Sequence, residues 1–214
     1  MASAVGVRQL VRYWVREVLG GAAHRRRLRR LGIDVDSVPL SRLGLDPRRA
    51  HNHAYSGGPD LERVLRDLPI GPDDAVLDVG CGKGGALLTL ARFPFGVLAG
   101  FDLSQEMLDV ARRNLDLAGF ARVELFAADA AVFDDYDRFT YLYMYNPFPR
   151  DVMRQAVEAM EESVRRVPRC LTVIYKNPLF HDEIVRNGLF VELRRYEHSG
   201  HPIVVYRSAS PAAE

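Results

Sequence analysis

A glycine-rich loop between an apolar run and a helical pattern constrains the fold of this chain more than any other feature. The loop is Gly80-Cys81-Gly82-Lys83-Gly84, and it follows the mostly apolar run at 75–79. Glycine is needed there because a side chain would collide with a ligand lying across the strand end, and because the turn favours positive φ. A strand, loop and helix of this kind is typical of a parallel α/β sheet that binds a ligand at its carboxyl edge.

Apolar runs and helical patterns alternate through the rest of the chain. Strands that are continuously apolar are typical of a parallel sheet covered by helices on both faces, so we expect an α/β sandwich of three layers. The last two runs flank turn residues near Gly200, which predicts an antiparallel hairpin. The expected strands are 75–79, 96–101, 123–127, 139–145, 170–175, 189–196 and 203–207, and the expected helices are 84–92, 104–117, 150–167 and 180–186, after one that starts near residue 60.

The first 45 residues are expected to form a basic helical extension. Apolar residues at 7–19 recur with helical spacing while Arg8, Arg12 and Arg16 line another face, and a second basic stretch covers 25–30. This helix either packs on the domain with a solvated arginine face or contacts a partner, an RNA or an anionic membrane surface. Between 31 and 60 the periodicity fades, which predicts a surface loop.

These patterns divide the chain into the extension 1–45, one ligand-binding domain over 46–207 and a flexible tail at 208–214. We expect residues before about Asp46 to be dispensable for the fold of that domain. The chain has 214 residues, of which 48% are hydrophobic, enough for one sizeable core but not for two.

Net charge and the number of cysteines argue against several classes of function. The formal net charge is +1, so no global field attracts nucleic acid. The only two cysteines, Cys81 and Cys170, form no metal-ligand spacing, and we expect no disulfide. No apolar run approaches the roughly 20 residues that span a bilayer, and arginines interrupt the N-terminus where a signal peptide needs an uncharged segment. We therefore expect a soluble, cytoplasmic protein.

Acidic residues stand at the ends of three successive expected strands. Asp78 precedes the first glycine by two positions, where it pairs with a ligand ammonium group, accepts from loop amides, or does both. Asp102 ends the second strand at the distance where such folds bind a ribose diol, and Asp129 follows the third strand. The alternative is that Asp102 and Asp129 only cap the following helices.

The segments VLDVGCGKGG, GFDLSQEMLDVARRN and AADA resemble the class I, Rossmann-like S-adenosylmethionine-dependent methyltransferase family. The resemblance extends from about Asp60 to the C-terminal hairpin. It implies a seven-stranded, mostly parallel sheet in the order 3-2-1-4-5-7-6 and the cofactor S-adenosyl-L-methionine. The implied activity is methyl transfer to a nitrogen or oxygen nucleophile.

The same resemblance assigns roles to the loop and to the acidic residues. The glycines would flank the methionine part of the cofactor, Asp102 would bind the ribose hydroxyls, and Asp129 with Ala130 would hold the adenine. Cys81 is read as a small residue that fits a tight turn, and Lys83 either meets an anionic ligand or is solvated. The complete set of expected cofactor-binding residues is Asp78, Gly80, Cys81, Gly82, Gly84, Asp102, Leu103, Met107, Asp129, Ala130 and Asn146.

The fourth expected strand ends in Asn146-Pro147-Phe148-Pro149, which makes Asn146 the first candidate for a catalytic residue. The motif is similar to the Asn/Asp-Pro-Pro-aromatic signature of amino methyltransferases, in which the polar side chain and a backbone carbonyl bind the attacking amine. It departs from that signature at Phe148 and Pro149. We expect Pro147 to hold Asn146 in an extended conformation. The alternative is an Asn-Pro turn that only leads into the next helix.

Further candidates for the acceptor side lie in two loops. Tyr55, the second expected catalytic residue, follows His51 and His53 in a loop that precedes the first helix of the domain and would serve as a lid. The histidines are spaced as a metal pair, but no third ligand is near them in sequence, and no metal is proposed. The loop after the fifth strand adds Tyr175, Lys176 and Asn177.

Two other functions stay open at this point. In the first, the domain binds S-adenosylmethionine without catalysis and acts as a regulatory module through its basic N-terminal helix. A nicotinamide-dependent reductase is opposed by the GxGxG spacing and by the lack of a Tyr-x-x-x-Lys pair. For the methyltransferase, a small molecule or a protein is the favoured acceptor over a nucleic acid.

Overall fold

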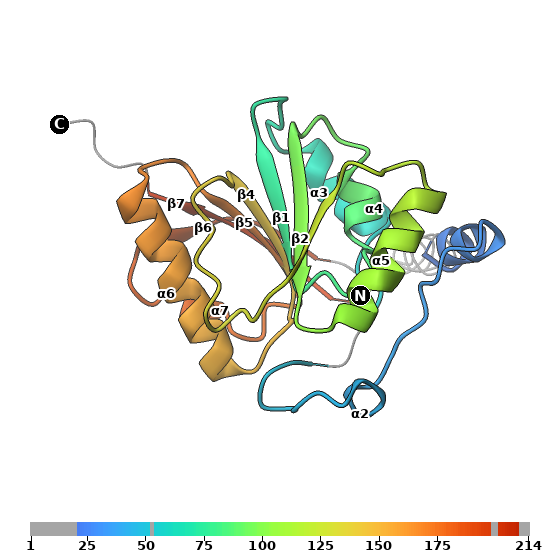
Figure 1. Cartoon of the computed structure of the whole chain (residues 1–214). Coiled ribbons are helices and arrows are strands. Elements are labelled where there is room, and N and C mark those ends of the chain that lie inside the picture. The colour runs from blue at the N-terminus through green and yellow to red at the C-terminus, as the bar shows by residue number, and fades with distance from the viewer. Residues whose placement is uncertain (1–20, 52–53, 198–200, 210–214) are drawn as a thin grey trace, which may run out of the picture.

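The computed structural model describes residues 21–51, 54–197 and 201–209. A single seven-stranded sheet in the order β3-β2-β1-β4-β5-β7-β6 runs through it (Figure 1). This is the predicted order, and the α/β fold with a Rossmann-like sheet is confirmed. The strands are β1 (Ala75–Val79), β2 (Val97–Asp102), β3 (Glu124–Ala127), β4 (Tyr141–Tyr145), β5 (Thr172–Lys176), β6 (Phe190–Tyr196) and β7 (Ile203–Ser208).

The first five strands are parallel, and β7 runs antiparallel to both β5 and β6. The expected C-terminal hairpin is therefore present. β7 extends through Ser208, which is buried and belongs to the strand although we placed it in the tail. Residues 210–214 of that tail lie outside the described residues.

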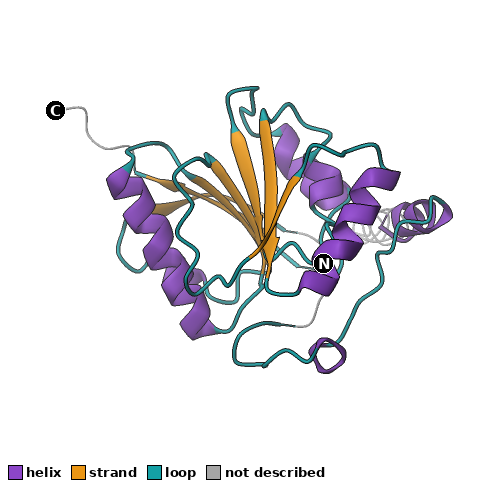
Figure 2. Ribbon diagram, in the orientation of Figure 1, coloured by secondary structure: helices purple, strands orange, loops and turns teal. Residues whose placement is uncertain are grey.

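Helices cover both faces of the sheet (Figure 2). Successive residues of a strand point to opposite faces of a sheet. In β1, Leu77 and Val79 pack into the core formed with α6 and α7, whereas Val76 packs into the core formed with α3, α4 and α5. The three layers follow from this alternation. The helices are α2 (Leu40–Leu43), α3 (Pro59–Arg66), α4 (Leu87–Leu90), α5 (Gln105–Leu117), α6 (Arg150–Arg166) and α7 (His181–Val185).

The local sequence explains where two of these helices begin. Ser104 caps α5, since its hydroxyl accepts from the Met107 N–H at 3.4 Å. The helix expected from Gly84 starts only at Leu87, so that prediction was too long. Gly84 has φ +77°, which a right-handed helix cannot include.

The segment expected as a surface loop contributes to the core. Residues 21–30 are helical, α2 follows, and the buried side chains of Leu28, Ile33 and Val35 join the core beneath α3 and α5. Most of the described part of 31–60 is loop as predicted, but the expectation that it runs over the surface was wrong at Ile33 and Val35. Too few apolar residues are present there to show a period. The expected helix at 7–19 lies outside the described residues.

Polar contacts fix this segment to the glycine loop. Asp34 forms an ion pair with Lys83, with 2.7 Å between Oδ2 and Nζ. The Asn114 side chain of α5 donates to the carbonyl oxygens of both Asp34 and Lys83, at 2.8 and 2.9 Å. In the part of the chain that the structure describes, no helix has the length and apolar character needed to cross a membrane.

Candidate functional site

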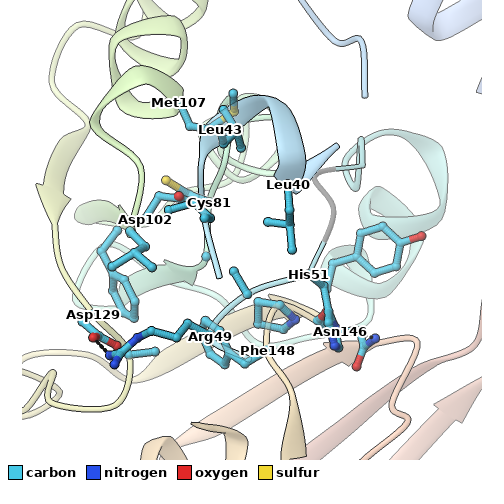
Figure 3. Close-up of a pocket in the computed structure, with 18 of the residues that line it drawn as sticks. Leu40, Leu43, Arg49, His51, Cys81, Asp102, Met107, Asp129, Asn146 and Phe148 are labelled. Atoms are coloured by element: carbon cyan, nitrogen blue, oxygen red, sulfur yellow. Dashed lines mark hydrogen bonds and ion pairs between the residues drawn. The ribbon is translucent and has the colours of Figure 1, made fainter. Parts of the chain in front are cut away.

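A cavity of about 340 Å³ opens at the carboxyl edge of the parallel strands (Figure 3). Its walls come from the glycine loop, the ends of β2 and β4, the segment after β3, and the N-terminal segment. Eight of the eleven residues predicted to bind the cofactor line it: Gly80, Cys81, Asp102, Leu103, Met107, Asp129, Ala130 and Asn146.

The glycine loop turns sharply below the cavity. Gly80, Gly82 and Gly84 have φ values of +76°, +50° and +77°, a region that side chains disfavour. A Cβ on Gly80 would lie 2.7 Å from the Cβ of Pro147. Gly80 is thus required both by its backbone angle and by the approach of the β4 end. Gly82 and Gly84 shape the loop without lining the cavity.

Asp102 organises the rim beside this loop. Its Oδ2 accepts from the Gly82 N–H at 2.8 Å and its Oδ1 from the Ser104 N–H at 2.9 Å. Burial raises the pKa of Asp102, and these backbone N–H groups oppose that rise. Each carboxylate oxygen has two lone pairs, so Asp102 can still accept from two hydroxyl groups of a ligand.

Asp78 lies in β1 beneath the loop and is not among the residues that line the cavity. Burial raises the pKa of Asp78 well above its usual range, and the nearby carboxylate of Asp102 raises it further. Its Oδ2 is buried without a hydrogen-bond partner among the described residues. A buried acceptor of this kind fits a ligand that brings a donor, preferably a cationic one.

Cys81 has the same buried surroundings. Desolvation raises the pKa of its thiol well above the usual range, and the carboxylates of Asp78 and Asp102 add to the effect. A thiol that resists ionisation is a poor nucleophile. This agrees with the interpretation of Cys81 as a small residue in a tight turn.

Asp129, the residue expected to hold an exocyclic amine, forms an ion pair with Arg49 (Figure 3). Its Oδ1 also accepts from the Ala131 N–H at 3.0 Å. Arg49 belongs to the N-terminal segment, which forms one wall of the cavity. The sequence analysis expected a lid at His51 but missed the part of this wall before it. The spacing of Leu40 and Leu43 was the available signal. The residues of this wall are Leu40, Leu43, Leu45, Arg49, Ala50, His51, Ala54 and Ser56.

Asn146 lies at the other end of the cavity from Asp129, beside His51 (Figure 3). Its φ of +39° is left-handed, so the expectation of an extended backbone was wrong. Asparagine tolerates this region better than most residues, and the hydrogen bonds around it stabilise the conformation. The Tyr175 hydroxyl donates to Asn146 Oδ1 at 3.2 Å, which brings together two of the predicted acceptor-side residues.

Other candidates lie away from the cavity. The Tyr55 hydroxyl is 2.7 Å from His24 Nε2, and its ring packs so closely on Gly85 that a Cβ there would lie 2.8 Å from Tyr55 Cδ2. The structure therefore gives Tyr55 a packing position and no contact with the cavity. Lys176 places its ammonium 5.0 Å from the centre of the Tyr145 ring, while Asn177 lines the cavity. His53 lies outside the described residues.

Comparisons with known proteins agree with this geometry. The sequence model of a family described as a methyltransferase domain matches residues 76–168. The trans-aconitate 2-methyltransferase of Rhizobium meliloti (strain 1021) is 42% identical over 79 residues, which are 35% of this chain and 30% of that protein. The release factor glutamine methyltransferase of Chlorobaculum tepidum is 45% identical over 73 residues, or 33% of this chain and 25% of that protein.

A solved structure of a SAM-dependent O-methyltransferase from Thermotoga maritima superposes with a TM-score of 0.60 at 16% identity, over 76% of this chain and 69% of that one. The chain spans less than a third of the length of either curated relative. The segment matched by the family model covers less than half of the chain. Together with the strand order, it shows a Rossmann-like fold that contains a region similar to methyltransferase domains.

Proposed function

We propose that this chain binds S-adenosyl-L-methionine in the cavity and transfers its methyl group to an acceptor held beside Asn146. The observation that carries the proposal is that predicted residues for the cofactor and for the acceptor line the same cavity. Asp102 and Asp129 lie at one side of it and Asn146 at the other (Figure 3), and Gly80 also lines it.

Each part of the cavity suits one part of the donor. The carboxylate of Asp102 fits a ribose diol, and the segment at Asp129 and Ala130 fits an adenine ring. Gly80 and the buried carboxylate of Asp78 suit the methionine end, where a ligand ammonium would satisfy the unpartnered Oδ2. When bound, the donor supplies an electrophilic methyl group on a sulfonium.

The chain itself contributes to the reaction by positioning the acceptor. Methyl transfer needs an acceptor atom aligned with the methyl–sulfur bond, and alignment alone supplies much of the acceleration. Asn146 is held at the end of β4 by Tyr175 of β5, so its amide is fixed and not free to rotate. A fixed amide at this point orients an acceptor.

The acceptor is proposed to be a small molecule or a protein side chain. The N-terminal segment closes one side of a cavity of about 340 Å³. We also propose that the helix at 21–30, with exposed arginines at 25, 26, 27 and 30, contacts a partner. One curated relative is named for a small molecule, trans-aconitate, and the other for a glutamine of a release factor, which is a protein.

Calorimetry with S-adenosylmethionine, S-adenosylhomocysteine and NADH tests the binding step. We expect both sulfur ligands to bind and NADH to give no signal. Conversion of S-adenosylmethionine to S-adenosylhomocysteine with a cell extract, compared with the same extract after dialysis, then tests transfer. Binding without any conversion in either extract would favour a non-catalytic module, and no binding at all would overturn the proposal.

A further inference from the structure

His51 is tied to the end of β4 by its main chain and by its ring. Its backbone N–H donates to the Pro147 carbonyl at 3.0 Å, and its Nδ1 lies 2.9 Å from the Asn146 carbonyl oxygen. The ring lines the cavity at the Asn146 end (Figure 3). The imidazole is therefore fixed at the place where the proposed acceptor must lie.

The partners of Nδ1 determine where the ring proton sits. Nδ1 is 2.9 Å from the Asn146 carbonyl oxygen and 3.3 Å from Asn146 Nδ2. A carbonyl oxygen only accepts, so the shorter contact requires a proton on Nδ1. The Tyr175 hydroxyl, which donates to Asn146 Oδ1, sets the amide orientation on the other side. In this tautomer Nε2 carries a lone pair.

The same contacts bear on the kind of acceptor. The amino methyltransferase signature binds its amine with the asparagine side chain and a backbone carbonyl of the motif. Here the Pro147 carbonyl accepts from the His51 N–H, the Asn146 carbonyl is bonded to the His51 ring, and Asn146 Oδ1 accepts from Tyr175. Each oxygen that would hold an amine already accepts one hydrogen bond within the chain and has one lone pair left to share, whereas the His51 ring offers a base to a hydroxyl acceptor.

We propose, on the basis of the methyltransferase function above, that His51 is the general base of the reaction and that the acceptor is a hydroxyl group. A neutral hydroxyl is a weak nucleophile, and its proton must leave as the new bond forms. The acceptor oxygen bonds to the methyl carbon as the methyl–sulfur bond breaks, with that electron pair staying on sulfur. The hydroxyl proton moves to His51 Nε2 and is then released to water.

The Asn146 carbonyl makes His51 suited to this step. It holds the ring in one tautomer, and it faces the positive charge that develops when Nε2 takes the proton. The guanidinium of Arg49, two residues earlier, is paired with Asp129 and directed to the other end of the cavity. Asn146 is then a positioning residue for His51 as well as for the acceptor.

A first test reads the tautomer without any turnover. Imidazole nitrogen NMR of the full chain with S-adenosylhomocysteine bound, assigned by comparison with His51→Gln, is expected to show a protonated Nδ1 and a proton-free Nε2. A proton on Nε2 in this complex would overturn the role of His51. Calorimetry on the same samples distinguishes failure of the His51 proposal from failure of the proposed function. If the proposed function is wrong, the unaltered chain does not bind the cofactor.

A second test uses three matched acceptor probes at about pH 8: phenol, 4-nitrophenol, which is largely ionised there, and aniline. We expect the unaltered protein to methylate phenol, and His51→Gln to lower that rate by about 100-fold or more. Its effect on 4-nitrophenol should stay within about fivefold, because an ionised oxygen needs no base. His181→Gln, which removes a histidine outside the cavity, is the matched control.

Three outcomes would overturn the proposal. An equal loss on phenol and on 4-nitrophenol would make His51 only structural. Methylation of aniline without methylation of phenol would assign the site to amines. Cofactor binding by the unaltered protein without turnover of either phenol would remove the hydroxyl class.

Discussion

Arg49 and Asp129 form an ion pair inside the cavity, at the position proposed for the adenine ring. The two side chains are 45% and 24% exposed, so the pair contributes about 0.2–1 kcal/mol. If a ligand amine takes the place of Arg49 on Asp129, that contribution opposes binding. Arg49→Ala should then tighten S-adenosylmethionine binding by about two- to fivefold.

The neighbouring Arg48 offers a matched control for that measurement, because it is exposed and pairs with Asp46 outside the cavity. Arg48→Ala should leave the dissociation constant unchanged in calorimetry. If Arg49→Ala weakens binding instead, Arg49 stays in contact with the bound ligand.

Asp102→Ala is expected to weaken S-adenosylmethionine binding by about 2–3 kcal/mol, or roughly 30- to 150-fold. The substitution removes the acceptors of the ribose hydroxyls and also the bonds to the N–H groups of Gly82 and Ser104. Calorimetry measures the affinity, and thermal unfolding shows whether the loop has lost its shape. An unchanged dissociation constant would exclude Asp102 from the ribose site.

Asn146→Ala should lower the rate of methyl transfer by about 10- to 1,000-fold while cofactor affinity changes little. The reason is that the Asn146 side chain orients the acceptor, and that asparagine tolerates the left-handed backbone which holds the Asn146 carbonyl against His51. Asn146 also lies across the cavity from the groups proposed to hold the adenosine (Figure 3). Tyr175→Phe, which removes only the donor to Asn146 Oδ1, should have a smaller effect in the same direction. Steady-state kinetics with phenol checks both. A loss confined to cofactor affinity would contradict this role.

Ile33→Ala should lower the free energy of unfolding by about 2–4 kcal/mol, because the side chain is 2% exposed within the core beneath α3 and α5. Leu31→Ala, at a side chain that is 55% exposed, should change it by less than about 0.5 kcal/mol. Denaturant titration compares the two. Equal, small effects would support the expectation that residues before Asp46 are dispensable for the fold.

Iodoacetamide is expected to label Cys170 and to leave Cys81 unmodified on the same time scale. Cys170 is exposed, whereas Cys81 is buried and its thiol pKa is raised. At about pH 8 the thiolate fraction of Cys81 is therefore small. Peptide mass spectrometry after timed labelling gives both rates. Rapid labelling of Cys81 would show that the loop opens often.

The sequence by itself determined the sheet and the donor side of the site. Local signals were strong there. Continuous apolar runs are typical of parallel strands, and alternate glycines are typical of the loop that follows a strand at a ligand-binding edge of the sheet. Asp102 and Asp129 follow strands, so the parallel order alone brings them to one edge. The spacing of these motifs along the sequence was enough to predict the sheet and the donor side of the site.

Only the tertiary structure decided the N-terminal wall and the acceptor side. Ile33, Arg49 and His51 stand in a segment without a period, and their positions depend on packing against α5 and the end of β4. The left-handed backbone of Asn146 and the hydrogen bonds of His51 and Tyr175 join residues 29 and 95 positions apart. Such contacts leave no pattern along the chain, because their energy comes from groups that meet only after folding.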